Sequence, residues 1–459
     1  MKKSTGSIFV FSLSMVACNF TPQLKPVSSP VSAKFPGRSD GVVSADIAWQ
    51  RFFTDVRLRK LVEISLVNNR DLRMAALNVE QSRAQYGISR SDLFPALNLS
   101  ASGVRQRSIG GGVSSRTPID SSTYDVSVGL VSYELDLFGR VRSLNSSALE
   151  SYFASDAARV GAQISLVAEV ANQYLTERAL SEQIALSQQT YEGFNTAYDI
   201  IKQRFDSGTV SEVDLSSMEV QRQTAKSDLA AFRQRISEVN HSLVFLAGGV
   251  LPKNLPSGRA LDQVLVADVR AGVSSELLYR RPDIREAEHQ LRSANANIGV
   301  ARAAFFPSIT LTADGGVSSN SLSKLFTNGT GTWMFAPAVK LPIFSGGRNQ
   351  ANLEYAEIGK MIEVANYEKS IQTAFREVAD RLAARGSLAE RISATVSLVA
   401  AQQKRTDLAT ARYEKGVDGY LEVLTATLDL YSARQSLIQL RLSRAINSVN
   451  LYKALGGGW

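Results

Sequence analysis

The fold is decided by residues 144–204, which read LNSSALESYFASDAARVGAQISLVAEVANQYLTERALSEQIALSQQTYEGFNTAYDIIKQR. This run contains no proline and is followed by a turn signal at Gly208. At about 1.5 Å per residue it predicts a helix on the order of 90 Å long, too long for a compact domain. Its apolar residues alternate in steps of four and three, which is typical of a narrow seam against another helix; they are Phe153, Ala157, Val160, Ile164, Val167, Ala171 and Tyr174. A second such run covers about residues 348–413, so the sequence predicts a rod or a tube.

A strand hairpin is predicted before each long run. Residues 97–101 and 124–130 alternate apolar and polar side chains around a Gly-rich loop at residues 105–122, and the pattern recurs at residues 309–313 and 333–341 around a loop at 318–332. One apolar and one polar face over this length is typical of a strand between lipid and water. An edge hairpin of a soluble sandwich is the alternative.

The two halves of the chain repeat each other. Residues 69–73 (NRDLR) correspond to 281–285 (RPDIR), and Phe94-Pro95 to Phe306-Pro307, at an offset of 212; from Gly139 onward the offset is 208. Phe138 has its counterpart in Phe344. A tandem duplication is therefore predicted.

These signals divide the chain into five segments. They are a signal peptide at 1–17; an acylated tether at 18–45; repeat 1 at 46–251, with equatorial helices, a hairpin at about 96–136, a long helix at about 144–206 and a short helix at about 212–247; an inter-repeat loop at 252–275; and repeat 2 at 276–459, with a helix at about 282–304, a hairpin at about 308–343, a long helix at about 347–414 and a short helix at about 420–455. Within repeat 1, apolar residues from Trp49 to Leu66 also have helical spacing, and a further helix is expected at about 71–90.

The N-terminus has the features of a secretory signal. Lys2 and Lys3 precede an apolar stretch at residues 8–16 that is too short to span a bilayer, and the chain's only cysteine, Cys18, lies at the expected cleavage site. Met15-Val16-Ala17-Cys18 resembles a bacterial lipobox, although Met15 stands where Leu is usual, and this implies a diacylglycerol and palmitoyl anchor on Cys18. Ordinary cleavage beside an incidental cysteine is the alternative. Asn19 implies sorting to the outer membrane.

Oligomerisation follows from the strand count. Four strands per chain cannot close a barrel or satisfy their edges in lipid. Two copies give eight strands and three give twelve, and physics alone does not choose between them. The formal net charge of +8 is weak support for nucleic-acid binding, and none is expected.

The motifs resemble those of TolC-like outer-membrane efflux factors. The likeness extends over about residues 46–457. It rests on residues 280–285 (RRPDIR), 301–309 (ARAAFFPSI), 341–348 (LPIFSGGR) and Arg412-Tyr413 followed by Gly416. With the lipobox, the chain is most similar to the lipoprotein branch typified by OprM and nodulation-type factors.

This resemblance implies a mainly α fold with transmembrane hairpins. Three copies would form a twelve-stranded outer-membrane β-barrel continuous with a periplasmic helical barrel. The homotrimer would be the exit duct of a tripartite pump with a periplasmic adaptor and an inner-membrane RND-type transporter, in a Gram-negative bacterium. Passive export of small amphipathic compounds is the expected function. A duct for protein secretion and a lipid-anchored coiled-coil structural protein are the alternatives.

The resemblance also indicates two candidate sites at the helical turns. Family tip motifs that dock the adaptor match seven residues: Phe205, Gly208, Thr209, Val210, Tyr413, Gly416 and Val417. Residues that constrict the periplasmic mouth in relatives match Asp214, Leu421, Glu422 and Thr425, where Thr425 stands in a position that relatives often fill with Asp. Glycines that merely end helices, and an acid at a solvated helix start, are the simpler interpretations.

Catalytic groups are scarce. His241 and His289 have no companion His or Cys at ligand spacing, so neither a metal site nor a catalytic triad is expected. The glycines at 110–112 open no helix and are not a phosphate cradle. The sequence predicts neither an enzyme nor a bound cofactor.

Overall fold

A computed structural model describes residues 19–32, 47–109, 118–264 and 279–457. The signal segment and Cys18 lie outside the described residues, as do residues 33–46, 110–117 of the first hairpin loop, 265–278 around the start of repeat 2, and 458–459. The chain divides into two compact units. Unit 1 comprises residues 1–27, 79–155 and 287–367, and unit 2 comprises residues 28–78, 156–286 and 368–459.

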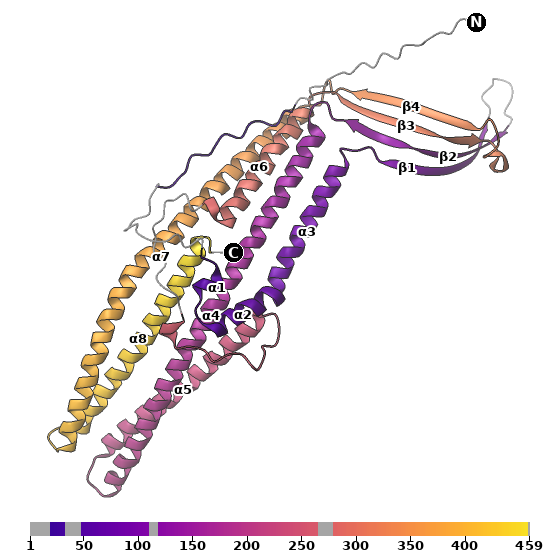
Figure 1. Cartoon of the computed structure of the whole chain (residues 1–459). Helices are drawn as coiled ribbons and strands as arrows, with labels where there is room; N and C mark the ends of the chain where they lie inside the picture. The colour runs from indigo at the N-terminus through magenta and orange to yellow at the C-terminus, as the bar shows by residue number, and fades with distance from the viewer. Residues whose placement is uncertain (1–18, 33–46, 110–117, 265–278, 458–459) are drawn as a thin grey trace, which may run out of the picture. The chain divides into compact units, whose positions relative to one another are not determined.

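Unit 1 contains one four-stranded antiparallel sheet in the order β1-β2-β3-β4 (Figure 1). Its strands are β1 (Leu97–Ile109), β2 (Pro118–Leu135), β3 (Ser308–Ser319) and β4 (Gly331–Lys340). Leu99 pairs with Val128, Val128 with Gly315, and Gly315 with Trp333, so one line of partners crosses all four strands. The two predicted hairpins thus lie side by side, which leaves β1 and β4 as the edges.

The first hairpin is longer than the sequence pattern predicted. The expected loop at 105–122 is mostly strand, because Arg107 and Asp120 pair across β1 and β2 through two hydrogen bonds of 2.6 and 2.8 Å. Alternation of apolar residues ends before this ion pair, so the pattern missed it. β2 also carries a bulge between Leu130 and Tyr133, where Ser132 has a positive φ of 56°.

Four helices are built from residues of both units: α3 (Arg70–Ser91), α4 (Arg140–Asp206), α6 (Pro282–Ala303) and α7 (Arg348–Glu414). α4 begins four residues before the start predicted from its apolar seam. The Asp136 carboxylate accepts a hydrogen bond from the Arg142 backbone N–H at 2.9 Å and so satisfies a donor of the first turn. Polar capping of this kind is invisible to a search for apolar periodicity.

The segment that follows Cys18 packs against unit 1. The Phe20 ring stacks on Phe306 with centroids 4.4 Å apart, and Thr21 Oγ1 lies 3.1 Å from Ser143 Oγ. Asn295 donates a hydrogen bond from Nδ2 to the Pro22 carbonyl at 2.8 Å. Residues 20–22 are therefore held on the helices of unit 1.

Unit 2 is centred on buried residues of both halves of the chain. The sequence between Trp49 and Leu66 forms two helices, α1 (Trp49–Phe52) and α2 (Val56–Asn68), because Asp55 ends the first stretch and caps the second. Its carboxylate accepts hydrogen bonds from the backbone N–H groups of Arg57 (2.7 Å), Leu58 (3.1 Å) and Arg259 (2.9 Å), and from the Tyr174 hydroxyl (2.9 Å).

The other helices of unit 2 are α5 (Glu212–Leu246) and α8 (Tyr420–Ala454), with a short 3-10 turn η2 (Leu261–Gln263). Arg281 closes the C-terminal end of α8: it donates to the Ala454 carbonyl at 2.8 Å and forms ion pairs with Asp283 and Glu377, each at 2.8 Å. Burial tends to lower the pKa of this guanidinium, but its two carboxylate partners outweigh it and raise the pKa.

The helices confirm the predicted tandem repeat. α4 and α7 each contain 67 residues, α5 and α8 each contain 35, and α3 and α6 each contain 22. Each long helix turns into a shorter one beside it (Figure 1). The predicted fold class, mainly α with paired hairpins in a duplicated chain, is correct.

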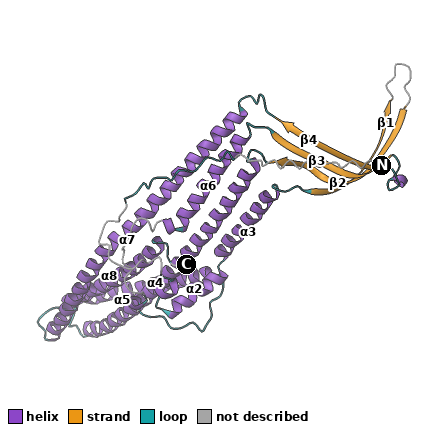
Figure 2. Cartoon of the chain, turned by 45° about the horizontal axis from the view of Figure 1, so that its top comes forward, coloured by secondary structure: helices purple, strands orange, loops and turns teal. Residues whose placement is uncertain are grey.

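Each pair of strands lies between helices in the sequence: β1 and β2 follow α3 and precede α4, and β3 and β4 follow α6 and precede α7 (Figure 2). A single turn of 3-10 helix, η4 (Leu322–Lys324), lies between β3 and β4. Among the described residues, no helix is both long enough and apolar enough to cross a membrane.

Candidate functional site

The two predicted tips are matching helix ends. In the first, the Gly208 N–H donates to the Phe205 carbonyl at 2.8 Å and the Thr209 N–H to the Arg204 carbonyl at 2.9 Å; in the second, Gly416 and Val417 donate to Tyr413 and Arg412, each at 2.9 Å. Gly208 and Gly416 have φ values of 74° and 69°, a left-handed conformation that favours glycine. Both glycines end helices, and the structure leaves open space beside each of them.

Hydrophobic clusters support the tips from inside unit 2. One joins α4 and α5 to α8 through five buried residues, which are Phe194, Ile201, Met218, Ala225 and Leu424. A second joins α7 to α8 through Ala409, Val423 and Ala426, with Tyr413 and Tyr420 packed against it. Each helical turn is therefore supported by a hydrophobic cluster, and both clusters include residues of α8.

Tyr413 links the two repeats. Arg204 at the end of α4 donates a hydrogen bond to the Tyr413 hydroxyl, and its guanidinium lies 5.5 Å from the centre of the same ring. Tyr413 also packs edge-on against Tyr420 at 5.1 Å. Five of the predicted tip residues are exposed, namely Phe205, Gly208, Thr209, Gly416 and Val417, whereas Val210 and Tyr413 are half-buried.

Asp214 is occupied by its own helix. Its carboxylate accepts hydrogen bonds from the Ser211 N–H at 3.1 Å and the Ser211 hydroxyl at 2.7 Å, while Ser211 Oγ accepts from the Asp214 N–H at 3.2 Å. This capping box satisfies donors at the start of α5. Within one chain, Asp214 thus acts as part of the N-terminal cap of α5.

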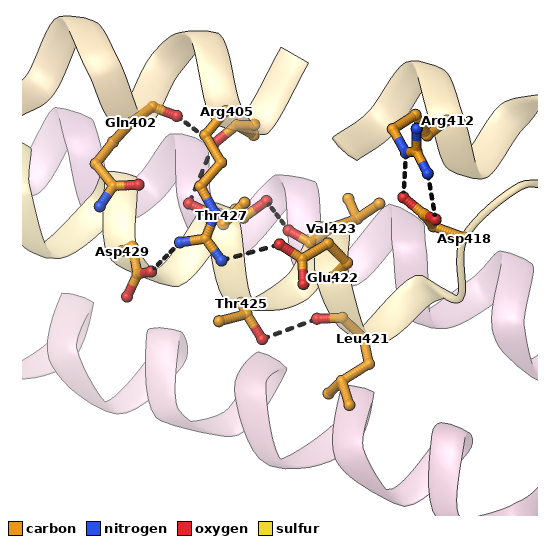
Figure 3. Close-up of polar contacts among 12 residues, drawn as sticks. Gln402, Arg405, Arg412, Asp418, Leu421, Glu422, Val423, Thr425, Thr427 and Asp429 are labelled. Atoms are coloured by element: carbon orange, nitrogen blue, oxygen red, sulfur yellow. Dashed lines mark hydrogen bonds and ion pairs between the residues drawn. The ribbon is translucent and has the colours of Figure 1, made fainter. Parts of the chain in front are cut away.

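Glu422 is paired with an arginine that the sequence pattern did not single out. Arg405 on α7 reaches both Glu422 at 2.9 Å and Asp429 at 2.7 Å on α8 (Figure 3). Hydrogen bonds to Glu422 first, and then to Asp429, raise the pKa of Arg405. One cation therefore faces two carboxylates, which leaves the trio with a net charge of −1 in each chain.

The other two predicted aperture residues on α8 are the apolar Leu421 and the hydroxyl-bearing Thr425. Leu421 is 70% exposed, and Thr425 Oγ1 donates to the Leu421 carbonyl at 2.9 Å. Thr425 thus uses its hydroxyl within α8 and supplies no charge.

A groove of about 710 Å³ runs beside this trio. Three basic and two acidic side chains line it: Lys404, Arg405, Arg412, Asp418 and Glu422. Arg412 holds Asp418 through hydrogen bonds of 2.5 and 2.9 Å, which lower the pKa of that carboxyl (Figure 3). Leu408 and Leu421 also line the groove, so its walls are partly charged and partly apolar.

Sequence reasoning missed these two ion pairs, Arg405–Glu422 and Arg412–Asp418, although a signal for them exists. In an antiparallel helix pair, residues at similar distances from the turn face each other, and the pairs Arg405–Glu422 and Arg412–Asp418 are nearly centred on the Tyr413–Gly416 turn. Opposite charges placed symmetrically about a predicted turn would have found both.

The two histidines have no ligand-like surroundings. His289 Nδ1 lies 2.7 Å from Glu150 Oε2, and His241 is exposed. In the part of the chain that the structure describes, no group of three or more His, Cys, Asp or Glu side chains is arranged to hold a metal ion.

Comparison with known proteins agrees with this arrangement. The family described as "Outer membrane efflux protein" matches residues 61–249 and 273–457, one match for each repeat. The toluene efflux pump outer membrane protein TtgC of Pseudomonas putida is 44% identical over 466 residues, covering 100% of this chain and 96% of its own. The cation efflux system protein CusC of Escherichia coli is 37% identical, covering 98% of each chain.

A solved structure shows the same fold. The open state of the MtrE outer membrane channel of Neisseria gonorrhoeae superposes with a TM-score of 0.89 at 40% identity, covering 96% of this chain and 98% of that one. The resemblance predicted from the motifs is confirmed, as is the prediction of an outer-membrane efflux channel. The chain belongs to the outer membrane efflux protein family.

Proposed function

We propose that three copies of this chain form the exit duct of a tripartite pump, through which small amphipathic compounds leave passively. An inner-membrane RND-type transporter would supply the energy, and a periplasmic adaptor would join it to the helical tips. The observation that carries the proposal is the sheet of unit 1, whose edges β1 and β4 have no strand partner within the sheet. Edges in lipid must be paired, so β1 of one copy would pair with β4 of the next and close twelve strands.

The side chains of the sheet suit a lipid boundary. Trp333, which is 82% exposed, Phe335 and Val339 are spaced by two or four residues on β4 and so share one face. The four strands contain 13, 18, 12 and 10 residues, and about 9–11 are needed to cross a bilayer obliquely. Aromatic residues on an outer face are typical of such walls.

The periplasmic aperture would lie at Leu421, Glu422 and Thr425, with Asp214 at the matching place in repeat 1. Three chains would bring three copies of the Arg405–Glu422–Asp429 trio together and give a ring with a net charge of −3 from these groups. Such a ring favours cations. The preference of this ring for cations depends on Arg405, because the positive charge of this arginine offsets one of the two carboxylates in each chain.

Conductance in planar bilayers tests the aperture. Glu422→Ala removes an acid and is expected to raise single-channel conductance and weaken block by divalent cations. Arg405→Gln bares two acids and is expected to strengthen the same block. The exposed acid Glu212, in the first turn of α5, supplies the control Glu212→Ala, which should leave block unchanged.

The two variants separate charge from stability. Loss of either partner breaks the same ion pair, so a purely structural role predicts effects of one sign. Opposite shifts in divalent block support an aperture at Glu422, and equal shifts exclude it. Purified protein that forms no heat-modifiable trimer and no channels would refute the duct and favour a coiled-coil structural protein.

Adaptor docking is tested separately at an exposed tip residue. Val417→Asp places a charge on the second tip, which should reduce co-purification of the adaptor and the efflux activity of cells. Conductance in bilayers should stay at the wild-type value, because Val417 lies at the turn and outside the groove. Loss of conductance together with docking would place Val417 in the duct instead.

We also propose that Cys18 carries the lipid anchor. The packing of residues 20–22 on unit 1 supports this, because it would hold the acylated end close to the protein body. Mass spectrometry of the mature N-terminus should show diacylglycerol and palmitoyl groups, and Cys18→Ala should remove them. An unmodified cysteine at the mature terminus would disprove the anchor.

A further inference from the structure

A cavity of about 280 Å³ lies in unit 1, where the strands join the helices. Its lining residues belong to three stretches: residues 134–140 between β2 and α4, 303–308 between α6 and β3, and 340–349 between β4 and α7. The predicted tip and aperture residues all belong to unit 2. This junction cavity is therefore separate from both of those candidate sites.

Both acids of the junction cavity are neutralised by arginines at the start of α4. Arg140 Nε and Nη2 donate to the two carboxylate oxygens of Glu134 at 2.8 and 2.5 Å. Arg142 Nε and the Arg142 backbone N–H donate to Asp136 at 3.0 and 2.9 Å. These four side chains carry no net charge together, so no acid is left over to offset a further cation in the cavity.

Two further cations line the junction cavity, and both come from repeat 2. Lys340 is the last residue of β4, and Arg348 is the first residue of α7. In the part of the chain that the structure describes, neither of these side chains forms an ion pair, and both are exposed. Each chain therefore leaves two positive charges in this cavity.

The excess of positive charge arises from a difference between the repeats. Arg348 is the counterpart of Arg140 at the offset of 208. Lys340 and Glu134 are counterparts as well, because each lies four residues before the matching phenylalanine of its repeat. Repeat 2 thus keeps the arginine and replaces the acid beside it with a second cation. The charge that an internal carboxylate supplies in repeat 1 is left for an external anion in repeat 2.

The strand pattern places Lys340 on the interior face of the proposed barrel. Side chains on a strand alternate between the two faces of the sheet. Trp333, Phe335 and Val339, which suit a lipid boundary, occupy odd positions of β4. Lys340 occupies an even position and so lies on the opposite face, which lines the water-filled channel of a closed barrel. A compound inside the duct can therefore reach this lysine.

Aromatic rings line the junction cavity together with the cations. Phe138 and Phe306 both belong to its wall, and their rings stack with centroids 5.0 Å apart. Pro307 and Pro342 add further apolar surface. Ligand sites commonly combine apolar walls with a few charged groups that fix the orientation of the ligand. The composition of this wall favours an organic anion over a small inorganic one.

We infer that the junction cavity is an anion-binding site of the duct and that it takes small aromatic carboxylates. Lys340 and Arg348 hold the carboxylate, and Phe138 and Phe306 receive the apolar ring. Arginine suits this task because its planar guanidinium matches the geometry of a carboxylate. The inference rests on the proposed duct, since Lys340 faces a channel only in a closed barrel. Three copies surround the channel with six of these positive charges, two from each chain.

Block of single channels by benzoate tests the site. Benzoate has a carboxylate on an aromatic ring, benzamide keeps the ring without the charge, and acetate keeps the charge without the ring. With the full-length protein in planar bilayers, benzoate is expected to reduce the current at concentrations at which benzamide and acetate do not. Higher salt should weaken this block, because it screens the charges that attract the anion.

Copying the acid of repeat 1 into repeat 2 gives the sharpest variant. Lys340→Glu should pair with Arg348 as Glu134 pairs with Arg140, and so remove both unpaired cations at once. An exposed charge pair contributes up to about fivefold in affinity, so benzoate block should weaken about fivefold in Lys340→Gln and about 25-fold in Lys340→Glu. Lys340→Arg keeps the charge and should retain the wild-type block.

Lys324→Gln is the matched control for the loss of one charge. Lys324 is also an exposed lysine, but it lies in η4, at the other end of the β3–β4 hairpin from Lys340. Benzoate block in this variant should stay at the wild-type value. Equal losses in Lys324→Gln and Lys340→Gln would mean that only the overall charge matters, and would overturn the site.

The outcomes separate the inference from the duct on which it rests. Conducting channels that respond to Glu422→Ala as expected, but are blocked equally by benzoate and acetate or keep the full benzoate block in Lys340→Glu, would overturn the inference and leave the duct intact. Protein that forms no channels would overturn both. Selective benzoate block that is lost in Lys340→Glu and kept in Lys340→Arg would support both.

Discussion

Replacing Asp55 by alanine is the sharpest test of how unit 2 is held together. This carboxylate is fully buried, caps α2, and receives hydrogen bonds from the Tyr174 hydroxyl and the Arg259 N–H, which come from residues far away in the sequence. Ser211 provides a matched control because it caps α5 but is exposed and contacts only its own helix. The difference between the two variants isolates the contacts that cross the unit.

The magnitude follows from the hydrogen bonds that are lost. An N-cap contributes about 1 kcal/mol, which is the cost expected for Ser211→Ala. Asp55→Ala also leaves the Tyr174 hydroxyl and the Arg259 N–H without their acceptor, at about 1.5 kcal/mol each. The total is about 4 kcal/mol, so Asp55→Ala should exceed Ser211→Ala by about 3 kcal/mol.

Hydrogen exchange measures this difference without requiring reversible unfolding of the whole protein. Peptides covering the first turns of α2 and α5 report the free energy of local opening. A difference of 3 kcal/mol corresponds to about two orders of magnitude in the opening constant. Asp55→Ala should therefore accelerate exchange in α2 about 100-fold more than Ser211→Ala accelerates exchange in α5.

Equal acceleration in the two variants would refute the reasoning. It would mean that the Tyr174 and Arg259 contacts add nothing to capping. Tyr174→Phe narrows the interpretation, because it removes one donor, keeps the ring and leaves the cap in place; its expected effect on α2 is about 1 kcal/mol.

Three further predictions follow from the same structure. Burial raises the pKa of Asp55, but the four hydrogen bonds to its carboxylate outweigh burial, so the folded-state pKa is lowered. The carboxylate therefore contributes its full stabilisation above the unfolded pKa of about 3.9, and this stabilisation is lost as the pH falls through the lower folded pKa. Exchange protection of α2, relative to Asp55→Asn, should be constant from pH 7 to about pH 5, and a decline beginning near pH 6 would contradict this. Gly299→Ala would place a Cβ 2.3 Å from Thr21 Oγ1 and 2.6 Å from Ser143 Oγ, so residues 19–32 should become sensitive to proteinase K, unlike in Gly87→Ala, where nothing lies within 4 Å. Gly416→Ala should cost about 1 kcal/mol of α7 end stability from its positive φ alone, and unchanged exchange at residues 412–417 would argue against that strain.

The architecture was largely predictable because it is repeated and periodic. Two copies of each motif at fixed offsets made the hairpins and the long helices visible, and a seam as long as the one from Phe153 to Tyr174 has few alternative explanations. The ends of elements were less predictable. The early start of α4 depends on Asp136 and the length of β1 on Arg107, and both are polar contacts without apolar periodicity.

The candidate site was predicted in position and missed in chemistry. The turns at Gly208 and Gly416 lie where the motifs placed them, but the resemblance says nothing of Arg405, because its contacts with Glu422 and Asp429 join residues that are 17 and 24 positions apart. Asp214 shows the converse. A residue selected by its repeat position proved to hold the start of its own helix.

The equal lengths of the paired helices restrict how such a chain can change its length. Removing one residue from α4 would shorten it by about 1.5 Å and rotate all that follows by about 100°, which turns the seam away from its neighbour. Removing seven residues shortens it by about 10 Å and nearly preserves the facing side. Because α4 and α7 each contain 67 residues, the same deletion would have to occur in both halves for the two tips to stay level. The lengths of the long helices in the two repeats are therefore coupled, so that viable length variants should delete or insert the same number of heptads in both.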